Sequence, residues 1–305
     1  MSNHLTNIEI KDFKCFKDFK AEGFKRVNLI GGKNNVGKTA FMEACYIYSY
    51  PLNSNDNSSM ALADTIFSRY AKDFFTDCMH EKGIKYLFNQ INSHSKIYEN
   101  TNINGLSNIY IKDDFLKSRN ANNVDFIFNE KQTNEQIEES YAYIIEEKLE
   151  IEIDKIISLF DNSIESFRII KSEPKCRLKE NGIFHHLNEF GEGLHKYITY
   201  ILALYSTKDG ILFIDEVDSG LHYSIFNELW KIILKISKEQ NVQVFATTHS
   251  KECIESYARV AKELEDEDIA FIELGRNKKN KLDSIVMDSE MFLRHIKMGN
   301  EVRGW

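Results

Sequence analysis

Residues 32–39 (GKNNVGKT) place two glycines, a lysine and a threonine at the spacing G-x-x-x-x-G-K-T. The residues before them, 26–30, predict a short buried strand, and the apolar residues of 40–50 recur with a helical period. A strand that leads into a glycine-rich loop and then into a helix is the context in which backbone N–H groups surround phosphate. This stretch therefore predicts a nucleotide-binding loop.

The residue types in this loop assign the expected contacts. Gly32 and Gly37 allow the main chain to turn its N–H groups inward, and the helix dipole adds positive potential. Lys38 can reach the terminal phosphates, and the Thr39 hydroxyl can bind Mg²⁺. The expected nucleotide contacts within and directly after this loop are Gly32, Lys33, Asn34, Asn35, Val36, Gly37, Lys38, Thr39 and Ala40.

Two further polar motifs follow apolar runs later in the chain. Residues 211–214 predict a strand that ends in Asp215 and Glu216, and residues 242–246 predict a strand that leads to His249. Asp215 and His249 lie 34 residues apart, about the length of one βαβ unit, with a helix expected at 224–239. Because open α/β sheets bind ligands at the carboxyl ends of their strands, we expect both motifs to meet the phosphate loop.

The acidic pair has the chemistry that transfer of a phosphoryl group to water requires. Asp215 can hold Mg²⁺ through water, since this ion prefers few carboxylates and several waters. Glu216 can orient or deprotonate the attacking water, and His249 can donate a hydrogen bond to the terminal phosphate. A lone histidine is more often structural or solvated, but its place at the end of the neighbouring strand favours the functional role.

Composition limits the classes of partner. The 39 Lys and Arg against 47 Asp and Glu give a net charge of −8, so no overall basic surplus favours nucleic acid. Residues 1–40 are locally basic, with eight basic and four acidic residues, whereas residues 130–165 hold eleven acidic and three basic residues. The five scattered cysteines predict reduced thiols in a cytoplasmic protein, and no signal peptide or membrane span is expected.

The order of these patterns predicts one head domain with an insertion. We assign residues 1–50 and 175–305 to the head and residues 51–174 to a largely helical lid. A strand followed by a turn is expected in residues 5–20. The lid is expected to contain a helix at 65–88, strands at 109–111 and 124–128, and one or two acidic helices within 133–168. Near the C-terminal end, the basic turn 276–281 is expected to be a solvated hairpin tip, with DNA contact as the alternative.

With these motifs established, the chain resembles ABC-type ATPases of the RecF/SMC-like clade, notably small prokaryotic "AAA-family" ATPases found alone or beside phage-defence effectors. The resemblance rests on the phosphate loop and on residues 8–19 (IEIKDFKCFKDF), 187–194 (LNEFGEGL), 211–223 (ILFIDEVDSGLHY) and 242–255 (VQVFATTHSKECIE). It implies an α/β P-loop NTPase fold, an ABC-type ATPase head with a mixed or parallel sheet and a helical lid, and ATP with Mg²⁺ as ligands.

The resemblance also implies roles for residues outside the three motifs. Gly191, Glu192 and Gly193 resemble the ABC signature, which in the family completes the nucleotide site of the opposite copy. Gly191 stands where a serine is usual. Residues 218–222 resemble the loop that lines the dimer seam. Lys14 takes the place of a basic residue near the nucleotide, and Gln132 is a weak candidate for the family's glutamine loop.

The expected function is Mg²⁺-dependent ATP hydrolysis by a nucleotide-sandwich dimer, or a higher homo-oligomer, that controls a partner protein. An anti-phage effector encoded nearby is the partner that the resemblance implies. One alternative is a RecF-like repair ATPase that binds DNA, so DNA stays open as a partner. Another is a clamp that holds ATP with very slow turnover. No membrane partner is expected.

Overall fold

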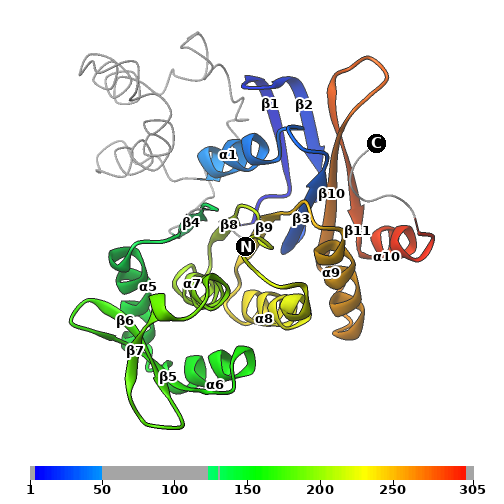
Figure 1. Cartoon of the computed structure of the whole chain (residues 1–305). Helices are drawn as coiled ribbons and strands as arrows, with labels where there is room; N and C mark the ends of the chain where they lie inside the picture. The colour runs from blue at the N-terminus through cyan, green and yellow to red at the C-terminus, as the bar shows by residue number, and fades with distance from the viewer. Residues whose placement is uncertain (1–3, 50–122, 130, 300–305) are drawn as a thin grey trace, which may run out of the picture.

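The computed structural model describes residues 4–49, 123–129 and 131–299, which form an α/β fold around a mixed six-stranded sheet (Figure 1). The expected helix at 65–88 and strand at 109–111 lie outside the described residues. Within the described ranges, no helix combines the length and the apolar character that crossing a membrane requires.

The main sheet confirms the predicted fold class. Its neighbouring strands run parallel except at one edge, where β11 pairs antiparallel with β10. Strand β9 lies between the strand of the phosphate loop and the strand that ends before Asp215. The order across the sheet is β11 (Leu282–Asp288), β10 (Ile269–Arg276), β3 (Val27–Gly32), β9 (Gln243–Thr247), β8 (Ile211–Ile214) and β4 (Val124–Ile127).

Both faces of this sheet are covered, which explains why its strands are apolar along their whole length. In β8, Leu212 and Ile214 belong to one hydrophobic core, whereas Ile211 and Phe213 belong to the other. The first core contains the helices α7 (Glu192–Ser206), α8 (Phe226–Glu239), α9 (Lys251–Glu263) and α10 (Ser289–Lys297). The second contains α1 (Lys38–Ser49) and an N-terminal hairpin.

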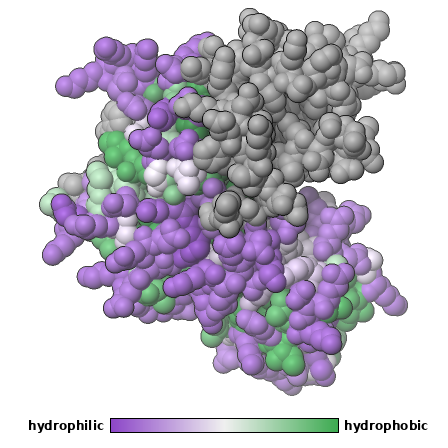
Figure 2. All heavy atoms as spheres, turned by 180° about the vertical axis from the view of Figure 1, so that it is seen from behind, coloured by the Kyte–Doolittle hydropathy of each residue, from purple (hydrophilic) through white to green (hydrophobic). Residues whose placement is uncertain are grey.

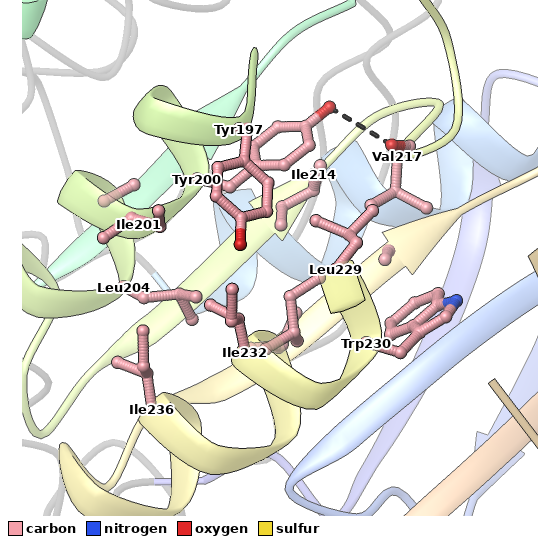
Figure 3. Packing of buried hydrophobic residues seen from close by; sticks show 14 of the residues in the cluster. Tyr197, Tyr200, Ile201, Leu204, Ile214, Val217, Leu229, Trp230, Ile232 and Ile236 are labelled. Atoms are coloured by element: carbon pink, nitrogen blue, oxygen red, sulfur yellow. Dashed lines mark hydrogen bonds between the residues drawn. The ribbon is translucent and has the colours of Figure 1, made fainter. Parts of the chain in front are cut away.

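The contact between α7 and α8 anchors the first core. Figure 3 shows Leu204 of α7 close to Ile232 and Ile236 of α8, in the core to which Ile214 of β8 also belongs. The Tyr200 hydroxyl donates a hydrogen bond to the Val217 carbonyl oxygen, 3.4 Å away. This bond ties α7 to the segment that follows Asp215 and Glu216.

The N-terminal residues differ from the prediction of one strand followed by a turn. They form an antiparallel hairpin of β1 (Asn7–Phe13) and β2 (Phe16–Glu22), with Lys14 at the turn in a left-handed conformation (φ 50°). The second strand was missed because its lysines alternate irregularly with buried Phe16 and Phe19. The hairpin lies over α1, and β2 lies against β11 (Figure 1).

The described part of the predicted lid is not separate from the head. Strand β4 pairs with β8 as the edge strand of the main sheet, and the predicted boundary at residue 174 falls inside a second, three-stranded sheet. That sheet consists of β5 (Ile164–Ile170), β6 (Glu173–Leu178) and β7 (Phe184–His186). The assignment of residues 51–174 to a lid otherwise stays a prediction, because residues 50–122 lie outside the described ranges.

The predicted helical region 133–168 contains two helices and the start of a strand. Helix α5 (Asn134–Glu146) begins with a capping box of Thr133 and Gln136, and α6 (Glu150–Phe160) follows it. The Asp161 side chain accepts hydrogen bonds from the main-chain and hydroxyl groups of Ser163, which forms a turn and ends the helix. Ile164 therefore begins β5, although its apolar side chain fits the helical stripe.

Candidate active site

Three strand ends meet at one edge of the main sheet. Strand β3 leads into loop 32–39, β8 ends before Asp215, and β9 ends two residues before His249. These strands are neighbours in the order β3–β9–β8 and run parallel, so their carboxyl ends point the same way. The structure thus brings together the three motifs that the sequence separates by more than 200 residues.

The phosphate loop needs its glycines for two reasons. Gly32 and Gly37 have φ values of 141° and 98°, in the left-handed range that favours glycine. A Cβ atom at Gly32 would lie 2.5 Å from the carbonyl oxygen of Leu274 in β10. A Cβ atom at Gly37 would lie 2.7 Å from the Cys15 sulfur in the N-terminal hairpin. The loop is therefore held between β10 and the hairpin with no room for a side chain at either glycine.

Lys38 is buried at the centre of the site. Its Nζ donates hydrogen bonds of 2.9 Å to the carbonyl oxygens of Gly32 and Lys33, and it lies 3.1 Å from Nδ1 of His249. Burial lowers the pKa of Lys38 to about 8, while Asp215 and Glu216 act in the opposite direction. Because burial disfavours the charged form, the ammonium group would be stabilised by a negatively charged ligand such as the terminal phosphates of a nucleotide.

The contact with Lys38 fixes the tautomer of His249. An ammonium group has only protons to give, so Nδ1 of His249 accepts, and the neutral ring carries its proton on Nε2. Burial and the nearby Lys38 both lower the pKa of His249, which favours this neutral ring. Nε2 lies 3.9 Å from Oε1 of Glu216. The N–H donor of His249 therefore lies on the side of Glu216.

Thr39 and Asp215 form an oxygen-rich pair suited to Mg²⁺. The Thr39 hydroxyl lies 3.2 and 3.3 Å from the two carboxylate oxygens of Asp215, across the gap between α1 and β8. One hydroxyl and one carboxylate, with space left to water, is a ligand set that Mg²⁺ accepts in nucleotide sites. The donor chemistry at this point therefore fits the ion.

Thr247 was not singled out from the sequence, yet it links both acidic residues. Its hydroxyl donates to Oδ1 of Asp215 at 2.8 Å and accepts from the main-chain N–H of Glu216 at 2.8 Å. Glu216 has a left-handed φ of 50°, which turns its side chain away from the strand direction. The threonine thus holds the carboxylate of Asp215 and the main chain of Glu216, directly after the neighbouring strand β8.

Asn129 is a second residue that the sequence did not reveal. It follows β4, and its side-chain amide donates a hydrogen bond to Oε2 of Glu216. Gln132, the weak candidate for the family's glutamine loop, instead lines a cavity of about 370 Å³ with Asn123, Val124 and Thr207. The sequence feature that could have indicated Asn129 is its place directly after the predicted strand 124–128, where a polar side chain can reach the edge of the sheet.

The predicted signature residues lie at the amino end of α7. Gly191 is the N-cap of this helix, has no side-chain cap, and is exposed. A Cβ atom at Gly193 would lie 3.5 Å from the carbonyl oxygen of Gly220 and from Leu221. The structure therefore places Gly191–Gly193 beside residues 218–222, while Glu192 pairs with Lys196 four residues later.

Lys14 is held by a different partner from the one expected. Its ammonium group forms an ion pair with Glu43 of α1, on the side of the helix toward the N-terminal hairpin. The pair fastens the hairpin turn to the helix that follows the phosphate loop. A contact between Lys14 and nucleotide stays a prediction.

Comparisons with known proteins agree with this geometry. Residues 80–255 match the sequence model of the family described as "AAA domain, putative AbiEii toxin, Type IV TA system". Because the match spans more than half of the chain, the chain belongs to this AAA family. The matched range includes Asp215, Glu216 and His249 and leaves out loop 32–39.

Two relatives and a solved structure extend the comparison. The chain is 26% identical over 331 residues to an "ATP/GTP phosphatase" of Helicobacter pylori (strain ATCC 700392 / 26695), covering 85% of this chain and 89% of that protein. A stretch of 44 residues is 39% identical to the DNA replication and repair protein RecF of Nitrosococcus oceani, 14% of this chain and 12% of RecF.

The solved structure is an SMC head bound to the C-terminal winged-helix domain of ScpA. It aligns with a TM-score of 0.52 at 12% identity, over 96% of this chain and 99% of that chain. At this identity the likeness shows the fold alone. The chain is thus a P-loop ATPase with the α/β fold of an SMC head.

Replacing Lys38 by Met is expected to weaken ATP binding by about 10- to 100-fold, because a hydrogen bond to a charged group contributes about 1.5–3 kcal/mol. Titration calorimetry of the folded variant and of the wild-type protein measures the change. Lys33→Met, at an exposed position of the same loop, is the matched control and should change the affinity less. Equal affinities for Lys38→Met and wild type would contradict the placement of the phosphates.

ATP affinity is also expected to depend on pH. In the free protein the pKa of Lys38 is about 8, and bound phosphates would raise it because they favour the ammonium form. Binding above that pH must take up a proton, so the affinity should fall as pH rises through about 8. Calorimetry in buffers of different ionisation enthalpy measures the proton uptake, which should disappear in Lys38→Met.

Replacing Asp215 or Thr39 by Ala is expected to raise the Mg²⁺ concentration needed for half-maximal turnover by about tenfold, the effect typical of losing a group that holds a metal or its ligands. Neither residue belongs to a hydrophobic core, so both variants should fold without nucleotide. Asp215→Ala should lower the melting temperature more than Thr39→Ala, because Asp215 accepts the hydrogen bond of Thr247 and lies near the buried charge of Lys38. A Mg²⁺ titration of steady-state hydrolysis tests this. Wild-type Mg²⁺ dependence in both variants would show that the ion binds elsewhere.

Proposed function

We propose that the chain binds ATP with Mg²⁺ at this edge of the sheet and hydrolyses it between two copies of itself. The opening and closing of this pair would control a partner protein. The observation that carries the proposal is the convergence of Lys38, Asp215, Glu216 and His249 from three neighbouring strand ends. A nucleotide site without hydrolysis would not need a glutamate beside the metal-binding aspartate.

The proposed roles follow from the donors and acceptors. Lys38 and the loop N–H groups hold the phosphates, and the neutral His249 donates its Nε2–H to the terminal phosphate. Glu216 accepts the proton of the attacking water as negative charge moves onto the leaving oxygen. Bound Mg²⁺ would neutralise charge on the phosphate oxygens. Positioning and electrostatics would supply most of the rate.

The amino end of α7 supports a site completed by a second copy. Its first N–H groups have no side-chain partner, Gly191 leaves open space around it, and the helix is 15 residues long. Such an end attracts anions. Because Gly191–Gly193 lie beside residues 218–222, both segments would face the partner subunit together. ATP would then be enclosed by Lys38 of one copy and by this helix end of the other.

A protein partner is favoured by the surface of α5 and α6. Glu135, Glu139 and Glu146 are exposed on α5 and Glu152 is exposed on α6. Two large hydrophobic side chains of α6 are exposed as well, Ile151 at 70% and Leu159 at 65%. Figure 2 shows separate hydrophobic areas among mainly hydrophilic residues on this part of the back face. Negative charge repels nucleic acid, so we propose that this surface binds a protein. In the hypothesis drawn from the family resemblance, that protein is an anti-phage effector.

One observation favours DNA as a second candidate partner. The tips of the β1–β2 and β10–β11 hairpins lie at the same end of the molecule (Figure 1). Burial raises the pKa of the Cys15 thiol in the first tip, while the cations Arg276 and Lys14 act against it, so the charge of Arg276 at the end of β10 reaches the first tip. The exposed cations of the two tips are Lys14, Lys17, Arg276, Lys278, Lys279 and Lys281.

Glu216→Gln keeps the side-chain shape but removes the base, so hydrolysis is expected to fall by about 10²–10⁴-fold. Bound ATP should then persist and shift the chain toward the paired state. Light scattering with and without ATP measures the pairing. A further variant, Gly191→Glu, should prevent pairing, since the space around Gly191 is open and a charged side chain there would occupy the place of the phosphates.

Mixing gives the decisive control. Lys38→Met and Gly191→Glu should each be nearly inactive alone, and together they should recover up to about a quarter of the activity, because one composite site per mixed pair is intact. If mixed pairs form without any recovery, each copy hydrolyses ATP by itself. If pairing is equal with and without ATP, nucleotide is not the switch and a slow clamp is favoured.

For the DNA candidate, replacing Lys278 and Lys279 by Glu should weaken duplex binding and lower its salt slope by about one per lost phosphate contact. Fluorescence anisotropy between about 50 and 200 mM salt measures both effects. Lys235→Glu with Lys238→Glu, two exposed positions on α8, is the matched control. If the affinity of the wild-type protein for duplex DNA does not depend on salt, these tips do not bind DNA.

A further inference from the structure

Lys196 is a buried cation that none of the assigned roles uses. It lies in the second turn of α7 and is 6% exposed. Its Nζ is 2.9 Å from Oδ1 of Asn129 and 3.7 Å from Oε1 of Glu192. A lysine in this position loses hydration, so the surrounding acceptors must compensate the charge.

The bond from Lys196 fixes the orientation of the Asn129 amide. An ammonium group cannot accept a hydrogen bond and a carboxylate cannot donate one, so only one orientation satisfies both neighbours. Oδ1 must face Lys196, and the NH₂ group must face Glu216, as the two hydrogen bonds have it. The cation thus determines that Asn129 presents a donor to Glu216.

This chain of bonds holds one side of the Glu216 carboxylate. Asn129 binds Oε2, while Oε1 lies on the side of His249. The main-chain N–H of Glu216 is already held by Thr247. With the main chain and one oxygen fixed, rotation of the carboxylate is restricted, and a water would meet Oε1. A base held in this way loses less freedom when it accepts a proton.

Electrostatics agree with the geometry. Burial lowers the pKa of Lys196, while the carboxylates of Glu192, Glu216 and Asp218 act in the opposite direction. Glu192 lies in the first turn of α7, next to Gly191, and Glu216 lies at the end of β8. Lys196 therefore stands between the helix end and the acidic pair and interacts with both.

We propose that Lys196 and Asn129 are positioning residues for Glu216 and that they connect it to the amino end of α7. The inference rests on the proposed function, since it takes Glu216 as the base. Neither residue touches the reacting atoms. Their contribution is to hold the carboxylate in the orientation from which it accepts a proton, and Glu192 shares the same cation at the surface that would meet a second copy.

The test uses the full chain and three variants. Lys196→Met removes the charge and keeps the length, Asn129→Asp keeps the shape and replaces the donor by an acceptor, and Lys196→Arg keeps the charge. We expect the first two to lower kcat by about 10- to 100-fold, part of the effect of a general base. ATP affinity, measured by calorimetry, and KM should stay within about twofold. Lys196→Arg should recover most of the rate.

Two comparisons distinguish positioning from a structural effect. In the Glu216→Gln background, Lys196→Met and Asn129→Asp should change the residual rate by less than about twofold, because they act through the missing carboxylate. Lys235→Met, an exposed lysine on α8 with the same chemical change, should leave kcat unchanged. Melting temperatures identify a variant that does not fold. If Lys196→Met does not fold, the test is made with Asn129→Asp, which preserves the side-chain volume.

The outcomes separate this inference from the proposed function. If Glu216→Gln lowers kcat while folded Lys196→Met and Asn129→Asp keep the wild-type rate, the positioning role is wrong and the proposed function stands. If Lys196→Met or Asn129→Asp lowers the rate of the Glu216→Gln protein by the same factor as it lowers the wild-type rate, the inference is also overturned, because the effect would not pass through Glu216. If Glu216→Gln itself keeps the wild-type rate, the base assignment fails and the positioning role fails with it.

Discussion

Burying a lysine ammonium group is costly unless acceptors and negative charge surround it, and the candidate site is arranged around one such group. Lys38 is 5% exposed, and its protons go to two loop carbonyl oxygens and to His249. One of those carbonyls belongs to Gly32, whose left-handed φ of 141° a residue with a side chain rarely adopts. The charge therefore constrains the loop, the start of α1 and the tautomer of the histidine together.

The sheet gives this arrangement its stability. Because both faces are covered by apolar cores, the strand ends cannot shift without disturbing packing on two sides. Thr247 at the end of β9 then links Asp215 and Glu216 on β8, so two strands fix the acidic pair. The same edge also places Asn129, from β4, within reach of Glu216. Residues from four strands thus meet on one rigid support.

The motifs could be predicted from the sequence because each is local. Loop 32–39 is defined by its own spacing, and Asp215 and His249 follow apolar runs that only a doubly covered sheet explains. Asn129 and Lys196 could not be found this way, because their contact joins residues 67 positions apart and depends on β4 pairing with β8. A lone lysine in α7 looks like a solvated residue until its neighbours are known. Strand β2 was missed for a related reason, since its pairing with β1 and not its composition defines it.

The place of β3 in the sheet has a consequence for how the protein is made. This strand spans residues 27–32, yet its two neighbours, β9 and β10, begin at residues 243 and 269. During synthesis the phosphate loop is made before either neighbour of β3 exists, so this strand stays without those partners until β9, more than 200 residues later, has been made. Pairings this distant in sequence close slowly, because a long loop must be ordered first. The nascent chain therefore carries an incomplete nucleotide site until β9 and β10 have been made, and the ability to bind ATP arises only after that point.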